Sequence, residues 1–89
     1  MANVIVKKLD ALTFEVTVEG ATCTIHIVTL PPDYAEKLTA GRISALRLIT
    51  LSFEFLLARE PNTSILRRFD LPLIASYFPE YEQTISKLL

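Results

Sequence analysis

Residues 12–27, with the sequence LTFEVTVEGATCTIHI, decide the fold class that we predict for this chain. From Leu12 to Glu19 apolar and polar residues alternate, which is typical of a β-strand with one face in the core and one in water. Gly20 marks a turn, and a two-residue loop of Glu19 and Gly20 matches every apolar residue with an apolar partner. The predicted pairs are Val18 with Ala21, Val16 with Cys23, Phe14 with Ile25, and Leu12 with Ile27.

An earlier apolar segment, NVIVKKL at residues 3–9, predicts a third antiparallel strand. Beyond residue 30 the pattern favours helices. Ser44 has the position and the side chain of an N-cap, so it predicts a main helix from about Ala45 to Glu60, which Pro61 ends. Shorter helices are predicted within residues 31–41, 64–69, 70–78 and 79–89.

The whole chain, residues 1–89, is predicted to form a single α+β domain. Its N-terminal three-stranded antiparallel β-meander packs against a long central helix, and short C-terminal helices close the fold. Hydrophobic residues make up 51% of the sequence and the mean hydropathy is +0.37, which is high for so short a chain. Some apolar surface is therefore expected to remain for a partner.

Charge and cysteine content favour a cytoplasmic protein. The net charge is −1, from nine Lys and Arg against ten Asp and Glu, so no overall field draws the chain to nucleic acid or to an anionic membrane. Polar residues interrupt the most apolar stretch before it reaches the ~18 residues of a membrane span. The single cysteine, Cys23, cannot form an internal disulfide, which fits a reducing compartment.

We predict no catalytic apparatus, no metal site and no cofactor, and therefore a protein that is not an enzyme. His26 is the only histidine, and the predicted register places it outside the sheet and Cys23 inside, which excludes a Cys–His pair. His26 is expected to face solvent, and a ligand contact beside Glu15 is the alternative. Glu80 and Glu82 stand at a predicted helix start, where the helix dipole explains them better than catalysis.

Three arginines in AREPNTSILRRFDLPLI, residues 58–74, are the candidate binding residues. Arg59 is expected in the last turn of the main helix, where the dipole favours a cation. Arg67 and Arg68 are consecutive on a predicted short helix, so one can pair with Asp70 or Glu60 while the other stays free. Structural ion pairs are the favoured interpretation, and contact with an anion or a partner is the alternative.

The main helix carries more apolar surface than one sheet face can cover. Leu48, Leu51 and Phe55 form one ridge at spacings of three and four. The second ridge, which is the candidate to cover the sheet, consists of Leu46, Ile49, Phe53, Leu56 and Leu57. We expect the first ridge to join copies of the chain in a dimer or a higher oligomer, because leaving it in water forgoes much stabilisation. Alternatively, residues 64–69 and the last helix fold back over this ridge within one chain.

Most of the chain, from about Leu12 to Glu82, resembles a family of small uncharacterised bacterial proteins. The resemblance rests on SFEFLLAREPNTSILRRFDLPLIASYFPEYE at residues 52–82, together with TFEVTVEG and TCTIHIVTL upstream. It implies no activity, cofactor, ligand or partner, and it therefore carries no functional residue to this chain.

The sequence thus predicts a small non-enzymatic protein-interaction module that self-associates. The alternative is a nucleic-acid-associated regulator that acts through Arg59, Arg67 and Arg68. A membrane is not expected as a partner, nucleic acid is the less favoured partner, and a small-molecule ligand stays open.

Overall fold

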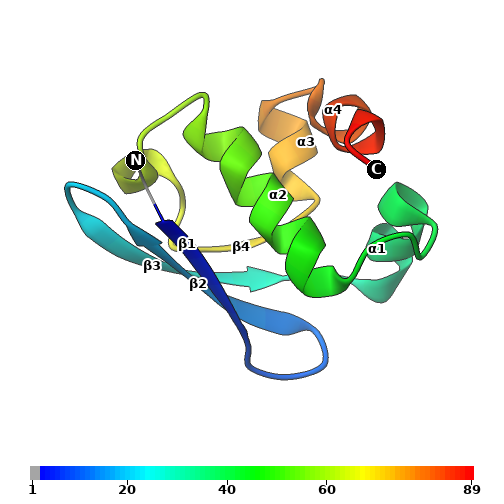
Figure 1. The fold of residues 1–89 in the computed structure, drawn as a ribbon, viewed down its shortest axis with the longest axis horizontal. Helices are drawn as coiled ribbons and strands as arrows, with labels where there is room; N and C mark the ends of the chain where they lie inside the picture. The colour runs from blue at the N-terminus through cyan, green and yellow to red at the C-terminus, as the bar shows by residue number, and fades with distance from the viewer. Residues whose placement is uncertain (1–2) are drawn as a thin grey trace.

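A computed structural model describes residues 3–89, which form a four-stranded mixed sheet and four α-helices. The strands are β1 (Asn3–Lys8), β2 (Thr13–Glu19), β3 (Cys23–Thr29) and β4 (Arg68–Asp70). The helices are α1 (Pro32–Thr39), α2 (Ala45–Leu57), α3 (Leu73–Tyr77) and α4 (Tyr81–Lys87), and a 3₁₀ turn, η1 (Asn62–Ser64), precedes β4. Figure 1 shows the helices gathered on one side of the sheet. The fold therefore has the α+β class that the sequence predicts.

The sheet contains one strand that the sequence did not predict. Its order is β1-β2-β3-β4, with the first three strands antiparallel and β4 parallel to β3. The predicted helix over residues 64–69 is wrong, because this segment leaves η1, extends and enters β4. The Ile27 N–H donates to the Arg67 carbonyl at 2.7 Å, which ties the extended segment to β3. Pairing with the sheet outweighs the weak helix preference of so short a segment.

The register between β2 and β3 differs from the prediction by three residues. Glu19 pairs with Cys23, so the loop has three residues, and Val16 pairs with His26 instead of Cys23. Because side chains alternate along a strand, this odd shift moves every β3 side chain to the other face of the sheet. Exposed on β3 are Cys23 and Ile25, and buried are Thr24, His26 and Val28.

The β3 sequence contains two alternating sets of residues, and the structure buries the one with more polar members. The observed inner set continues past the strand into Leu30, which is also buried. Its two polar members, Thr24 and His26, both make hydrogen bonds, so their burial does not leave a polar group unpaired. Hydrophobic matching alone therefore favoured the wrong register.

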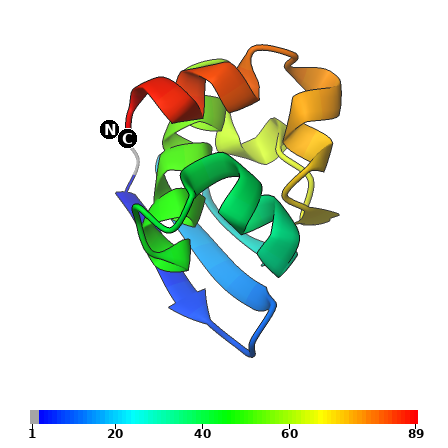
Figure 2. The ribbon, with the colours of Figure 1, turned by 90° about the vertical axis from the view of Figure 1, so that its right-hand side faces the viewer.

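Helix α2 lies at the centre of the molecule. It begins after Ser44, whose Oγ accepts a hydrogen bond from the Arg47 N–H at 3.1 Å, which confirms the predicted N-cap. It ends at Leu57, three residues before the predicted Glu60. Figure 2 shows α4 along the top of the molecule and the strands at the bottom, with α2 between them. The side chains of Leu48, Ile49 and Phe53 on α2 are completely buried.

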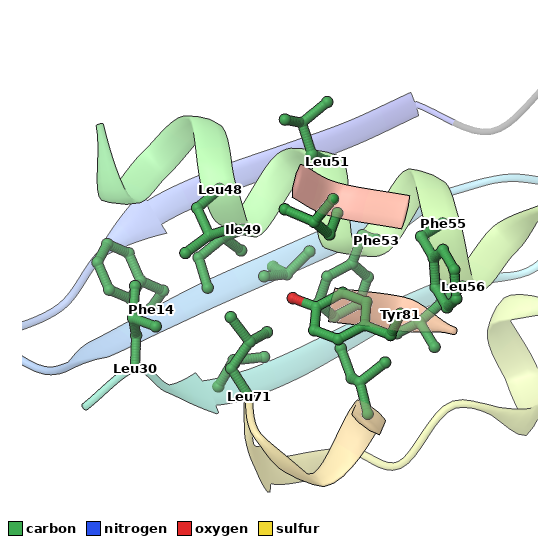
Figure 3. Close-up of a cluster of buried hydrophobic side chains, with 14 of the residues drawn as sticks. Phe14, Leu30, Leu48, Ile49, Leu51, Phe53, Phe55, Leu56, Leu71 and Tyr81 are labelled. Carbon is green, nitrogen blue, oxygen red and sulfur yellow. The ribbon is translucent and has the colours of Figure 1, made fainter. Parts of the chain in front are cut away.

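Tyr81 attaches α4 to α2. Its buried ring packs edge-on against Phe55, with 5.2 Å between the ring centroids (Figure 3). The Oγ of Ser52 donates to the Leu48 carbonyl at 2.7 Å, so the Tyr81 hydroxyl is the donor in its hydrogen bond to Ser52. The phenol is protonated at neutral pH even at its usual pKa, and burial raises the pKa of Tyr81 well above that value, so the donor also persists in alkaline solution.

Candidate functional site

The face of the sheet turned away from the helices is the candidate interaction surface. Two neighbouring rows of side chains cross the strands on this face. They are the row of Ile5, Thr17 and Ile25 and the row of Lys7, Glu15, Ile27 and Arg68. We call these two rows the open face. Ile5 is 51% exposed and Ile25 is 50% exposed, so the first row presents apolar surface to solvent.

The open face follows from strict alternation along β2. Phe14, Val16 and Val18 point toward α2 and are buried, which leaves Glu15 and Thr17 on the opposite side. The register of β1 and β3 then places Ile5 and Ile25 on either side of Thr17. Two large aliphatic side chains therefore flank one small polar residue at the middle of the sheet.

Arg59 is held by contacts within the chain. Its Nε lies 3.3 Å from Glu80 Oε2, and its Nη1 donates to the Phe55 carbonyl at 3.1 Å. The guanidinium also stacks over the Phe55 ring, 3.6 Å from the centroid. These contacts agree with the structural interpretation of Arg59, and its charge is already paired with Glu80.

Arg67 and Arg68 are exposed, and the structure gives them no ion pair among residues 3–89. Arg68 begins β4 and Arg67 immediately precedes it, so neither residue lies on the predicted helix. Arg68 pairs with Ile27 and belongs to the open face, whereas Arg67 precedes the strand and takes no part in its pairing. Arg59 is bound to Glu80, so the three candidate arginines do not form one free anion-binding patch.

The predicted oligomer ridge is buried within the single chain. Leu48 is 0% exposed, Leu51 is 8% exposed and Phe55 is 5% exposed. α4 covers part of this ridge, since Phe55 packs against Tyr81, and Phe78 before α4 adds a second edge-on contact at 5.8 Å. The expectation of an exposed ridge was therefore wrong, and the part of the alternative in which the last helix folds back over the ridge within one chain describes this contact.

His26 is fully buried, which corrects the prediction that it faces solvent. Its Nδ1 lies 2.8 Å from the Leu66 carbonyl, which can only accept, so Nδ1 carries the proton. Its Nε2 lies 2.8 Å from the Thr24 hydroxyl, which donates to it. Asn62 Nδ2 in turn donates to Thr24 Oγ1 at 2.8 Å. This network joins β3 to the segment that precedes β4, and its role is structural.

The two carboxylates near the start of α4, Glu80 and Glu82, bind different partners. Glu82 accepts a hydrogen bond from the Tyr34 hydroxyl at 2.8 Å and lies 3.4 Å from Lys37 Nζ. Burial, together with this hydrogen bond, raises the pKa of the Tyr34 phenol well above its usual value. Glu80 instead pairs with Arg59. The two carboxylates thus hold helices together and do not form a catalytic pair.

The part of the chain that the structure describes contains no group of three His, Cys, Asp or Glu side chains arranged to hold a metal ion. Across the same residues, no helix has the length and the apolar character needed to cross a membrane.

Cys23 is an exposed free thiol, although the predicted register placed it in the core. The sequence analysis did not predict the buried hydrogen bond between Thr24 and His26. The residues that indicate it are Val28 and Leu30, because they continue the same alternation as Thr24 and His26 and are apolar.

The open face thus presents two half-exposed isoleucines beside Lys7, Glu15 and Arg68, which make no ion pair among the described residues. No family model, curated protein or solved structure matches this chain, so the resemblance to a family of bacterial proteins stays a prediction.

Proposed function

We propose that this protein is a small non-enzymatic interaction module that associates with a second copy of itself through the open face. The observation that carries the proposal is the pair of half-exposed isoleucines, Ile5 and Ile25, on a sheet face away from every described helix. A solvent-facing sheet surface is usually polar, so two large aliphatic side chains in one row favour contact with another surface.

Charge supports a second copy as the occupant. The row beside the isoleucines carries both signs, with Lys7 and Arg68 as its bases and Glu15 as its acid. A surface with both signs can offer each charge an opposite partner when it meets a copy of itself. The net charge of −1 also means that two copies repel each other only weakly.

The size of the apolar row sets the expected strength of association. Covering the exposed halves of two isoleucines on each copy contributes roughly 3–6 kcal/mol per dimer. This gain is similar to the lower end of the cost of association, about 4–15 kcal/mol, so contacts of Ile27 and the charged residues must add to it. A weak dimer with a Kd of roughly 0.1–1 mM needs a net gain of about 4–5.5 kcal/mol, and we assign the part that Ile5 and Ile25 do not supply to Ile27 and the charged residues.

Sedimentation velocity from about 20 µM to about 1 mM tests this proposal, because the range spans the expected Kd. Ile25→Lys places a charge in the row and should keep the protein monomeric at every concentration. Leu46→Lys is the matched control, since Leu46 is 43% exposed but lies at the start of α2, on the helix side of the sheet and not on the open face. A wild-type protein that stays monomeric, or a dimer that Leu46→Lys abolishes and Ile25→Lys spares, would overturn the proposal.

A second candidate function, a nucleic-acid-associated regulator, has one observation in its favour: Arg67 and Arg68 are exposed without an ion pair among the described residues. Two phosphate contacts give a log–log salt slope of about −1.8 for duplex DNA. Fluorescence anisotropy with a labelled duplex measures this slope. Binding near physiological salt that an Arg67→Ala, Arg68→Ala double variant removes would place this function ahead of self-association.

A further inference from the structure

A hollow of the molecule lies on the helix side of the sheet, where the end of α2, the η1–β4 segment and α3 meet. Its volume is about 370 Å³, within the range of small-molecule sites. Its floor is buried and apolar, and it consists of Leu56, Ile65, Phe69 and Ile74. Its rim is accessible, since Ser64, Leu66 and Tyr77 are exposed and Glu60 is partly exposed. We call this hollow the α2–α3 pocket.

Glu60 gives the α2–α3 pocket its charge. It is the single ionisable carboxylate among the described residues that line the pocket, and its side chain makes no ion pair or hydrogen bond within residues 3–89. The preceding residue, Arg59, is bound to Glu80 instead. Glu60 also follows the C-terminal end of α2, where the helix dipole favours a cation.

We propose that the α2–α3 pocket binds an amphiphilic cation, with an apolar body on the buried floor and a primary ammonium group beside Glu60. At the packing density of protein interiors, the volume accommodates roughly 10–15 non-hydrogen atoms. An anionic head group would meet the unpaired carboxylate, and a neutral one would gain no ion pair. Glu60 on the rim therefore favours a ligand with a positive charge, and the apolar floor favours a ligand with an apolar body.

Linear amines provide the probe. In 15N-labelled protein, n-octylamine below its micelle concentration should shift the amide signals of Ser64, Leu66 and Tyr77. Affinity should rise about fourfold for each methylene added to the chain, until the pocket is full. 1-Octanol should bind about threefold to fivefold more weakly, which is the contribution of one partly exposed ion pair, and octanoate should bind more weakly still.

Glu60→Gln should remove the preference for the amine over the alcohol and leave the affinity for the alcohol unchanged. Glu54→Gln is the matched control, because Glu54 is an exposed glutamate on α2 that does not line the pocket. Leu73→Trp, which fills the pocket from the start of α3, should abolish binding of both probes while the spectrum shows a folded protein. If Leu73→Trp does not fold, Glu60→Gln and its control still decide the outcome.

Equal affinity for octylamine and octanoate, or equal effects of Glu60→Gln and Glu54→Gln, would overturn the assignment of a cation site. Shifts of the pocket amides on raising the concentration of ligand-free protein would also overturn it, since a second copy would then occupy the pocket. The result is separate from self-association through the open face. Ile25→Lys should bind octylamine as the wild type does, so either proposal can fail while the other stands.

Discussion

Replacing His26 by alanine tests the β2–β3 register and the buried hydrogen bonds together. The imidazole is fully buried, donates to the Leu66 carbonyl and accepts from the Thr24 hydroxyl, both at 2.8 Å. Alanine leaves the Leu66 carbonyl without this partner, which costs about 1–3 kcal/mol. It also opens a void beside Phe53, whose ring centroid lies 5.4 Å away, and such voids add about 2 kcal/mol. We expect a loss of roughly 3–5 kcal/mol in the free energy of unfolding, a large part of the stability of a typical domain.

Urea unfolding followed by circular dichroism measures this loss as a lower midpoint at an unchanged slope. His26→Phe retains a ring beside Phe53 but removes both hydrogen bonds, so it should cost about 1–3 kcal/mol, and the difference between the two variants reports the packing. Ile25→Ala is the control, and it should cost less than about 1 kcal/mol because Ile25 is half-exposed. If Ile25→Ala destabilises the protein more than His26→Ala, β3 faces the other way and the open face loses its basis.

Three further predictions concern local structure. Ala40 ends α1 with a φ of +50°, so Ala40→Gly should raise the free energy of unfolding by up to about 1 kcal/mol, and a lower thermal midpoint would contradict this geometry. Ser44→Ala removes the cap on α2 and should cost about 1 kcal/mol in the same assay, whereas an unchanged midpoint would mean that the cap contributes nothing. Hydrogen bonds from the Leu12 and Thr13 N–H groups hold the pKa of Asp10 below its usual value, and an NMR titration that gives the value of a free aspartate would refute these bonds. The stabilisation by the Asp10 carboxylate should therefore be complete above the ordinary aspartate pKa and disappear as the pH falls through the lowered one.

The sequence predicted those elements that depend on contacts between residues close together in the chain. The alternation of β2 is unambiguous, and Ser44 caps α2 through a bond to a residue three positions away. The register of β3 could not be predicted in this way, because its two alternating sets are both plausible by hydrophobicity. The set that is buried depends on Leu66 and Asn62, which lie about forty residues further along the chain.

The candidate site was harder to predict than the fold. Helical spacing predicts the ridge of Leu48, Leu51 and Phe55 but not its cover, because the spacing does not show whether the last helix returns over α2. Conversely, Ile25 was expected in the core, and its exposure on the open face follows only from the three-residue loop before β3. Both errors concern which distant segment covers an apolar side chain, and helix or strand periodicity contains no information on that.

The short strand β4 also bears on the order in which the molecule assembles. It joins β3 through a pairing of Ile27 with Arg68, so a long loop must close before the first contact forms, whereas the hairpins of β1, β2 and β3 close over a few residues. We expect the antiparallel strands to form early and the segment around β4 to dock late and detach first. Because Ile65 and Phe69 of this segment form part of the pocket floor, an amphiphile in the α2–α3 pocket would slow that detachment. Slower hydrogen exchange at the β4 amides would then record the occupancy of the pocket.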